Sequence, residues 1–183
     1  MIIKVPNISF LQYYNLTDRD NYNYYLKYAD IKPKDIFNLG KFIELSFGFV
    51  KDLQELYNSS GFIMWNDLFN EIEKLTGKNK DKLSQLPLFD LHAFRLYLYE
   101  EIEEVNKRES ANLSHKASAE ETIAGLDEFG KYKAFLQFDK LAGGDILKID
   151  EVRKLPYSIC FTKLLLEAER TEFEKRLINI RKK

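Results

Sequence analysis

The feature that most constrains the fold is the repeated three- and four-residue spacing of large apolar side chains along most of the sequence. This spacing is strongest between residues 88 and 105, at Leu91, Phe94, Leu98, Ile102 and Val105. It recurs over residues 35–57, 62–75, 123–136 and 156–180. Apolar residues at this interval lie on one face of an amphipathic helix. The sequence therefore predicts an all-α fold: an irregular multi-helix bundle with an extended N-terminal arm and a long C-terminal helix.

Glycine and proline mark the expected ends of several helices. Gly77 is placed to cap the helix over 62–75 at its C-terminus. Pro87 ends a short charged turn over 78–85, and Pro156 can occupy the first position of the last helix. These breaks predict separate helices rather than one continuous rod.

Two other stretches contain glycines that predict less regular structure. Gly40 and Gly48 weaken a helix over residues 35–57, so we expect two helical pieces there. Gly143-Gly144 should turn the chain, and residues 145–149 are expected to form a short extended segment.

The composition of successive stretches predicts an arm, a bundle, a linker and a C-terminal unit. Residues 1–34 are rich in tyrosine and form the expected arm, which residues 35–105 follow as a helical bundle. Residues 106–122 contain almost no large apolar side chain and are the expected polar linker. Residues 123–183 then form a C-terminal helical unit, which could also pack with the first bundle as one compact domain.

The single cysteine, Cys160, excludes an intramolecular disulfide and a zinc site built on paired cysteines. We expect its thiol to be buried as a small apolar group. The N-terminal residues lack the pattern of a secretory signal, and no apolar run is long enough to cross a bilayer. The protein is therefore expected inside a cell, and neither secreted nor in a membrane.

The sequence contains no motif of a common enzyme class. It lacks a phosphate-binding P-loop, a dinucleotide-binding glycine motif, a zinc-protease motif and a nucleophile elbow. His92 and His115 are the only histidines, so a multi-histidine metal centre is excluded. We therefore expect a non-enzymatic protein with no catalytic residue, metal or cofactor. A small enzyme that uses Glu100, His92 or Asp145 across helices stays open as a less favoured alternative.

The charge distribution favours protein partners over nucleic acid. The net charge is −1 and the pI is about 6.2, whereas nucleic-acid-binding domains are usually strongly basic. The positive patch lies at Lys175-Arg176 and at residues 181–183, near the C-terminus. Glutamates crowd the end of the helix over 88–105, at positions 100, 101, 103 and 104, where they could serve a basic partner.

Two stretches carry a resemblance to a known group of proteins. They are residues 138–157, FDKLAGGDILKIDEVRKLPY, which precede a charged helix, and residues 35–45, DIFNLGKFIEL. Together they resemble small helical assembly proteins of tailed bacteriophages, among them tail-assembly chaperones and head-tail connector or tail ring proteins. The high usage of Lys, Asn, Ile and Tyr is similar to that of phages of AT-rich gut bacteria, including the crAss-like group.

The resemblance implies a structural or assembly component of a phage particle, located in the virion or in the host cytoplasm. Such a component acts through contacts with other phage structural proteins and with copies of itself in a ring. The residues expected to make these contacts lie in the tyrosine-rich arm and the basic tail: Tyr13, Tyr14, Tyr22, Tyr25, Arg176, Arg181, Lys182 and Lys183. An intracellular helical adaptor or chaperone of cellular origin has the same composition and remains the main alternative.

Overall fold

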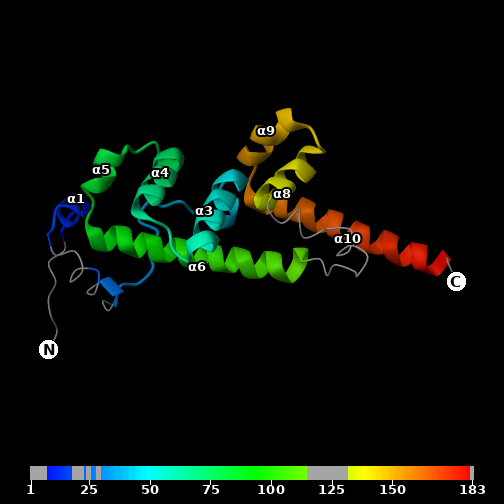
Figure 1. Ribbon diagram of the computed structural model, residues 1–183, viewed down its shortest axis with the longest axis horizontal. Helices are drawn as coiled ribbons and strands as arrows, with labels where there is room; N and C mark the ends of the chain where they lie inside the picture. Colours follow the sequence, from blue (N-terminus) through cyan, green and yellow to red (C-terminus); the bar gives the residue numbers. More distant parts are fainter. Residues whose placement is uncertain (1–7, 18–22, 24–25, 28–29, 115–131, 182–183) are drawn as a thin grey trace. The chain divides into compact units, whose positions relative to one another are not determined.

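The computed structural model describes residues 8–17, 23, 26, 27, 30–114 and 132–181, and all the regular structure within these ranges is helical (Figure 1). The elements are α1 (Phe10–Tyr14), η1 (Phe42–Glu44), α3 (Phe47–Ser60), α4 (Trp65–Thr76), α5 (Lys80–Ser84), α6 (Leu88–Leu113), α8 (Lys133–Ala142), η3 (Ile146–Lys148), α9 (Ile149–Lys154) and α10 (Tyr157–Arg181). The prediction of an all-α fold with a long C-terminal helix is confirmed.

The contacts of the chain divide it into two compact units, each built from two stretches of sequence. Unit 1 comprises Met1–Gly40 and Leu56–Glu103, and unit 2 comprises Lys41–Glu55 and Glu104–Lys183. Helix α6 covers residues 106–113 of the stretch that was expected to be a polar linker, and residues 115–122 of that stretch lie outside the described residues. The residues there that continue α6 are mostly good helix formers with no glycine or proline among them, so polarity alone does not end the helix.

In unit 1, the short helix α1 packs against α4 through aromatic rings. The Phe10 ring lies 5.2 Å from the Trp65 ring and 4.8 Å from the Phe69 ring, measured between centroids. Ser9 and Gln12 form a capping box at the start of α1, in which each side chain satisfies the backbone N–H of the other residue. This helix lies within the stretch that was expected to be an extended arm.

Residues 35–45 do not form the first helical piece that was expected there. The Asp35 carboxylate accepts hydrogen bonds from the backbone N–H groups of Phe37 and Leu39, at 3.1 and 2.5 Å. Asn38 and Gly40 both have positive φ angles, of 55° and 77°, which a helix does not allow. Local capping by the aspartate thus competes with helix formation, and only the short η1 turn precedes α3.

Unit 2 joins the start of α3 and the end of α6 to helices α8, α9 and α10. Phe47 is fully buried, and its ring contacts the rings of Phe138 and Tyr157, with centroids 5.2 and 6.0 Å away. A Cβ atom added at Gly48 would lie only 3.0 Å from the Cβ of Arg153. Gly48 therefore lies inside α3 and allows α9 to approach closely, whereas we had expected it to interrupt the helix.

The turn between α8 and α9 was predicted correctly, but the segment after it was not. Gly143 and Gly144 have φ angles of 67° and 78°, as expected of residues that end a helix and turn the chain. Residues 145–149 then form η3 and the start of α9 rather than an extended segment. The Asp145 side chain causes this by accepting a hydrogen bond from the backbone N–H of Leu147 at 3.1 Å.

Helix α10 has a buried first half and an exposed second half. Tyr157, Cys160 and Leu164 are buried within unit 2 on one face of the helix. From residue 169 to residue 181 every side chain is exposed except that of Leu177, which is partly exposed. Among the described residues, no helix has the length and apolar character that spanning a membrane requires.

Candidate functional site

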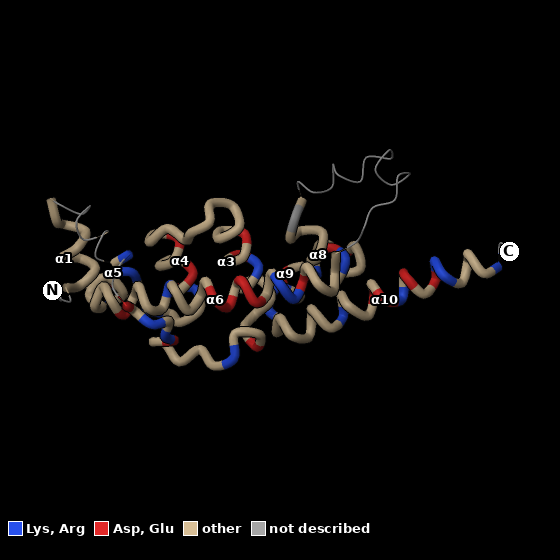
Figure 2. The backbone as a smooth tube through the Cα atoms, turned by 90° about the horizontal axis from the view of Figure 1, so that it is seen from below, with Lys and Arg blue, Asp and Glu red and all other residues tan. Residues whose placement is uncertain are grey.

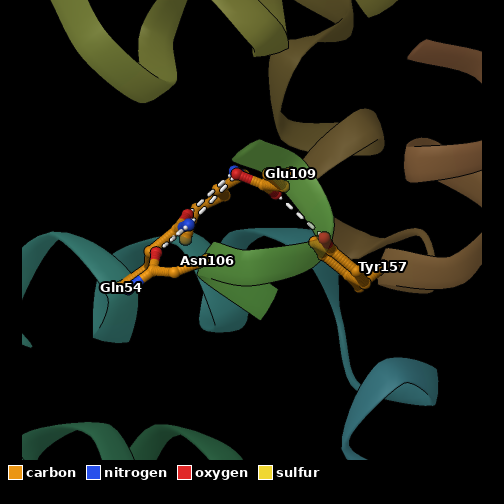
Figure 3. A network of polar contacts seen from close by, with 5 residues as sticks. Gln54, Asn106, Glu109 and Tyr157 are labelled. Atoms are coloured by element: carbon orange, nitrogen blue, oxygen red, sulfur yellow. Dashed lines mark hydrogen bonds and ion pairs between the residues drawn. The ribbon is translucent and has the colours of Figure 1, made fainter. Parts of the chain in front are cut away.

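A buried polar network in unit 2 is centred on Lys51 of α3 and Glu109 of α6 (Figure 3). The Lys51 side chain is only 2% exposed, and that of Glu109 is 13% exposed. The Lys51 ammonium donates to both oxygens of the Glu109 carboxylate, at 2.6 and 2.7 Å, and to Oε1 of Gln54 at 2.8 Å. An ammonium has three N–H donors, so all of them are satisfied inside the protein.

Three further hydrogen bonds extend this network to α10 and along α6. The Tyr157 hydroxyl donates to Oε1 of Glu109 at 2.9 Å. The Gln54 amide donates to Oδ1 of Asn106 at 2.7 Å and to Oε2 of Glu109 at 3.0 Å. Glu109 therefore lies between side chains of α3 and α10, as Figure 3 shows, and ties three helices of unit 2 together.

The electrostatics of the network fit a structural role. Burial lowers the pKa of Lys51, and the adjacent Glu109 carboxylate opposes this shift by favouring the charged ammonium. Burial also raises the pKa of the Tyr157 hydroxyl, and the negative charge of Glu109 adds to that shift. A catalytic lysine needs a free amine that faces a substrate, whereas the donors of Lys51 are all engaged. None of these residues was predicted as a site, because 58 positions separate Lys51 from Glu109 and no local motif links them.

His92 lies in a second buried cluster, on the part of α6 that belongs to unit 1. Its Nδ1 is 3.0 Å from a guanidinium nitrogen of Arg95, and the Arg95 guanidinium lies 4.1 Å from the centroid of the Trp65 ring. Because a guanidinium can only donate, Nδ1 must accept and the imidazole must be neutral. Burial, together with the charge of Arg95, lowers the pKa of His92 to about 4. His92 therefore positions Arg95, and its Nδ1 lone pair is already used.

The other residues considered for acid chemistry are dispersed. Glu100 is exposed on the unit 1 part of α6, and Asp145 in unit 2 caps η3 and pairs with Lys148 at 3.2 Å. Within the described ranges, no three His, Cys, Asp or Glu side chains gather in a way that could hold a metal ion. Cys160 is 1% exposed, and burial raises the pKa of its thiol to about 11. The expectation of a buried cysteine is confirmed.

The residues expected to contact partners have different environments. Tyr13 is buried in unit 1, where its hydroxyl donates to Oδ1 of Asn23 at 2.6 Å. Tyr14 is 58% exposed, and Arg176 and Arg181 are exposed near the end of α10. The remaining four, like His115, fall outside the described residues: Tyr22, Tyr25, Lys182 and Lys183.

The outward face of α10 carries an apolar stripe that the sequence reading did not single out. Ile159, Leu166, Phe173 and Ile180 follow one another at seven-residue intervals, and they are 56%, 48%, 57% and 71% exposed. With 3.6 residues per turn, they lie about 180° around the helix from the buried face that holds Tyr157 and Leu164. We call these four residues the α10 stripe. In the sequence, the α10 stripe is visible only as a seven-residue repeat. The three- and four-residue spacing of the other apolar residues of this helix hides that repeat.

A second exposed apolar surface lies in unit 1, in the loop between α3 and α4. Phe62 and Met64 are 48% and 56% exposed, on either side of the fully buried Ile63. The backbone N–H of Ile63 donates to the Tyr99 hydroxyl at 3.0 Å, which fixes this loop against α6.

The same loop is linked to Glu103 through two tyrosines. The Tyr99 ring lies 5.0 Å from the Tyr57 ring, and the Tyr57 hydroxyl donates to Glu103 at 3.0 Å. Glu103 and Glu100 are both exposed, and they are three residues apart on α6 and therefore neighbours on its surface.

Comparison with known proteins does not supply a function for either surface. The chain matches no protein-family model and no curated protein, and no solved structure matches it.

Proposed function

We propose that this protein is a non-enzymatic structural or assembly component of a tailed bacteriophage particle, which acts through protein–protein contacts at the head-tail connector or the tail. The observation that carries the proposal is the α10 stripe. A helix that packs only within its own domain places its large apolar residues on the buried side. The α10 stripe instead repeats on the opposite side of α10, over most of the length of that helix.

The seven-residue interval supports a helical partner in particular. Apolar residues at this interval stay on one side of the helix over several turns, where they fill one of the two apolar positions in each heptad of a supercoiled helix pair. Polar residues occupy most positions beside the α10 stripe, including Lys163, Glu169 and Arg170. The surface is therefore a narrow apolar seam with charged edges, which is the usual composition of an interface that forms between soluble proteins.

The α10 stripe is too small to hold two chains together on its own, so it fits a protein that makes several contacts within a larger assembly. Complete burial of one aliphatic or aromatic side chain contributes about 1.5 to 3 kcal/mol. The four residues are about half exposed or more, so covering them contributes roughly 4 to 8 kcal/mol in total. Association itself costs about 4 to 15 kcal/mol. The stripe alone thus supports a weak contact, and a stable complex needs additional contacts of the kind that a ring provides.

The α10 stripe indicates a protein interface but not its biological context. The resemblance to phage assembly proteins supports a phage particle as that context. Connector and tail ring proteins work through repeated contacts between copies of a helical subunit. A ring forms when a head-to-tail contact between identical subunits closes on itself. The stripe and the basic end of α10 are surfaces that such a contact can use.

Paired substitutions on α10 test the proposal. Ile180→Glu places a charge in the α10 stripe, whereas Ile178→Glu introduces the same change at a position that is 51% exposed and lies away from the stripe. Electron microscopy and sedimentation velocity should show ring-like assemblies for the unmodified protein and for Ile178→Glu, and their loss in Ile180→Glu. Equal behaviour of the two variants would refute a role for the α10 stripe.

A further inference from the structure

We propose that Arg95 and Tyr99 of α6 form a binding site for a carboxylate group in unit 1. This inference goes beyond the proposed function and does not depend on the α10 stripe, which belongs to unit 2. The site is built around a charged side chain that the fold surrounds without pairing it with an opposite charge. A polar group left unsatisfied in this way is a candidate for contact with a ligand.

The guanidinium of Arg95 has no acidic partner among the described residues. One terminal nitrogen lies 3.0 Å from Nδ1 of the neutral His92, and Nε is buried with no hydrogen-bond acceptor. Figure 2 shows acidic positions in red along α6, but no carboxylate within the described ranges forms an ion pair with Arg95. Burial lowers the pKa of Arg95, so its surroundings disfavour the charge that a guanidinium keeps at neutral pH. An anion beside Arg95 would offset this cost.

The Tyr99 hydroxyl supplies a second donor without an acceptor. Tyr99 follows Arg95 by four residues on α6, so the two side chains are neighbours on the helix surface. The phenol of Tyr99 also acts electrostatically on the pKa of Arg95, which requires the two groups to be close. Its oxygen accepts from the backbone N–H of Ile63 at 3.0 Å, whereas its own proton has no acceptor in the part of the chain that the structure describes. A hydroxyl can donate and accept at once, so this proton is available to a ligand.

The segment that leads into α4 holds both donors in place. Ile63 is fully buried, and its N–H fixes the Tyr99 hydroxyl. Two residues later, the Trp65 ring lies under the Arg95 guanidinium, whose Cζ is 4.1 Å from the ring centroid. A guanidinium that stacks on an aromatic face still presents N–H groups along its edge. Arg95 and Tyr99 are both partly exposed, so a ligand can approach them from solvent.

A carboxylate matches this pair of donors in shape and in charge. One of its two oxygens can accept from Arg95 and the other from Tyr99, and its single negative charge balances one guanidinium. Phosphate carries more charge and is usually held by several donors at a helix N-terminus or by more than one cation. Among the described residues, no second cation acts on the pKa of Arg95. The site therefore favours a carboxylate.

The fluorescence of Trp65, the only tryptophan, reports on this site because its ring lies under Arg95. Sodium acetate, compared with sodium chloride at the same ionic strength, should change this fluorescence saturably, with a dissociation constant in the millimolar range. Arg95→Gln should abolish the saturable change, and Tyr99→Phe should weaken binding about tenfold. Arg176→Gln removes one positive charge from an exposed position on α10, so this control should respond like the unmodified protein.

A second probe identifies the source of the carboxylate. Glutamate with its amino group acetylated and its α-carboxyl amidated presents only the side-chain carboxylate, and the matching glutamine derivative is its neutral control. Binding of the glutamate derivative but not of the glutamine derivative supports the site and indicates an acidic side chain of a protein partner. Binding of acetate but not of the glutamate derivative supports the site and indicates a small organic acid.

Thermal unfolding of the unmodified protein gives a test that needs no variant. Millimolar acetate should raise the unfolding temperature above that in chloride, because a ligand that binds only the folded state stabilises it. Equal fluorescence and equal unfolding temperatures in the two salts would overturn the proposal. A saturable response that Arg95→Gln retains with the same dissociation constant would also overturn it, provided that circular dichroism shows this variant to be folded.

Discussion

Replacement of Lys51 by methionine is expected to destabilise the protein far more than the loss of an exposed ion pair. Methionine fills a similar volume but leaves Glu109 without the ammonium that contacts both of its oxygens at 2.6 and 2.7 Å. Removal of one partner from a buried pair costs about 3 to 5 kcal/mol. Glu109 keeps hydrogen bonds from Tyr157 and Gln54, so we expect the lower end of this range, about 3 kcal/mol.

Urea denaturation followed by circular dichroism measures this loss as a change in the free energy of unfolding. The control is Lys107→Met on α6, the helix that carries Glu109. Lys107 pairs with Glu104 at 2.7 Å, and the two side chains are 67% and 65% exposed, so its loss should cost less than about 1 kcal/mol. The double variant Lys51→Met with Glu109→Leu should be more stable than Lys51→Met alone, because no unpaired charge is buried. A cost below about 1 kcal/mol for Lys51→Met would refute the assigned role of the network.

Three further predictions follow from buried groups. Gly48→Ala should lower the free energy of unfolding by about 1 to 2 kcal/mol, because the new Cβ would lie 3.0 Å from the Cβ of Arg153. This cost should exceed the gain from the better helix propensity of alanine, and a variant that is more stable in thermal unfolding would contradict it. Burial lowers the pKa of His92 from 6.5 to about 4, so folding favours the neutral imidazole, and about 2.5 kcal/mol of stability is lost as the pH falls from 6.5 to 4. His92→Gln should remove this part of the pH dependence measured by urea titration. Cys160 should resist alkylation at pH 8 in the folded protein and react readily in urea, because burial raises its pKa to about 11; rapid labelling of the folded protein would show that the thiol is accessible.

The parts of the fold that the sequence predicted are those in which one helix face is apolar throughout. The periodic residues of α4 and α6, and Gly77 in its left-handed cap, are local signals that tertiary contacts did not override. The short helix α1 also had a local signal, the Ser9 and Gln12 capping box, although its five residues are too few for periodicity to reveal.

Other features depend on contacts between distant residues and could not be read from local patterns. Gly48 has the sequence signature of a weak point in a helix, but its role is set by Arg153 of α9. The pairing of Lys51 with Glu109 likewise needs α3 and α6 to be adjacent. The α10 stripe could have been found from its seven-residue repeat, whereas its exposure required the structure.

The native mass of the purified protein, measured by light scattering over a series of concentrations, tests the central claim most directly. If the α10 stripe is an assembly surface, the mass should rise with concentration toward that of a closed ring, and Ile180→Glu should reduce it to that of one chain, 21.6 kDa. A mass of one chain for the unmodified protein at every concentration would contradict assembly through contacts between copies of this chain.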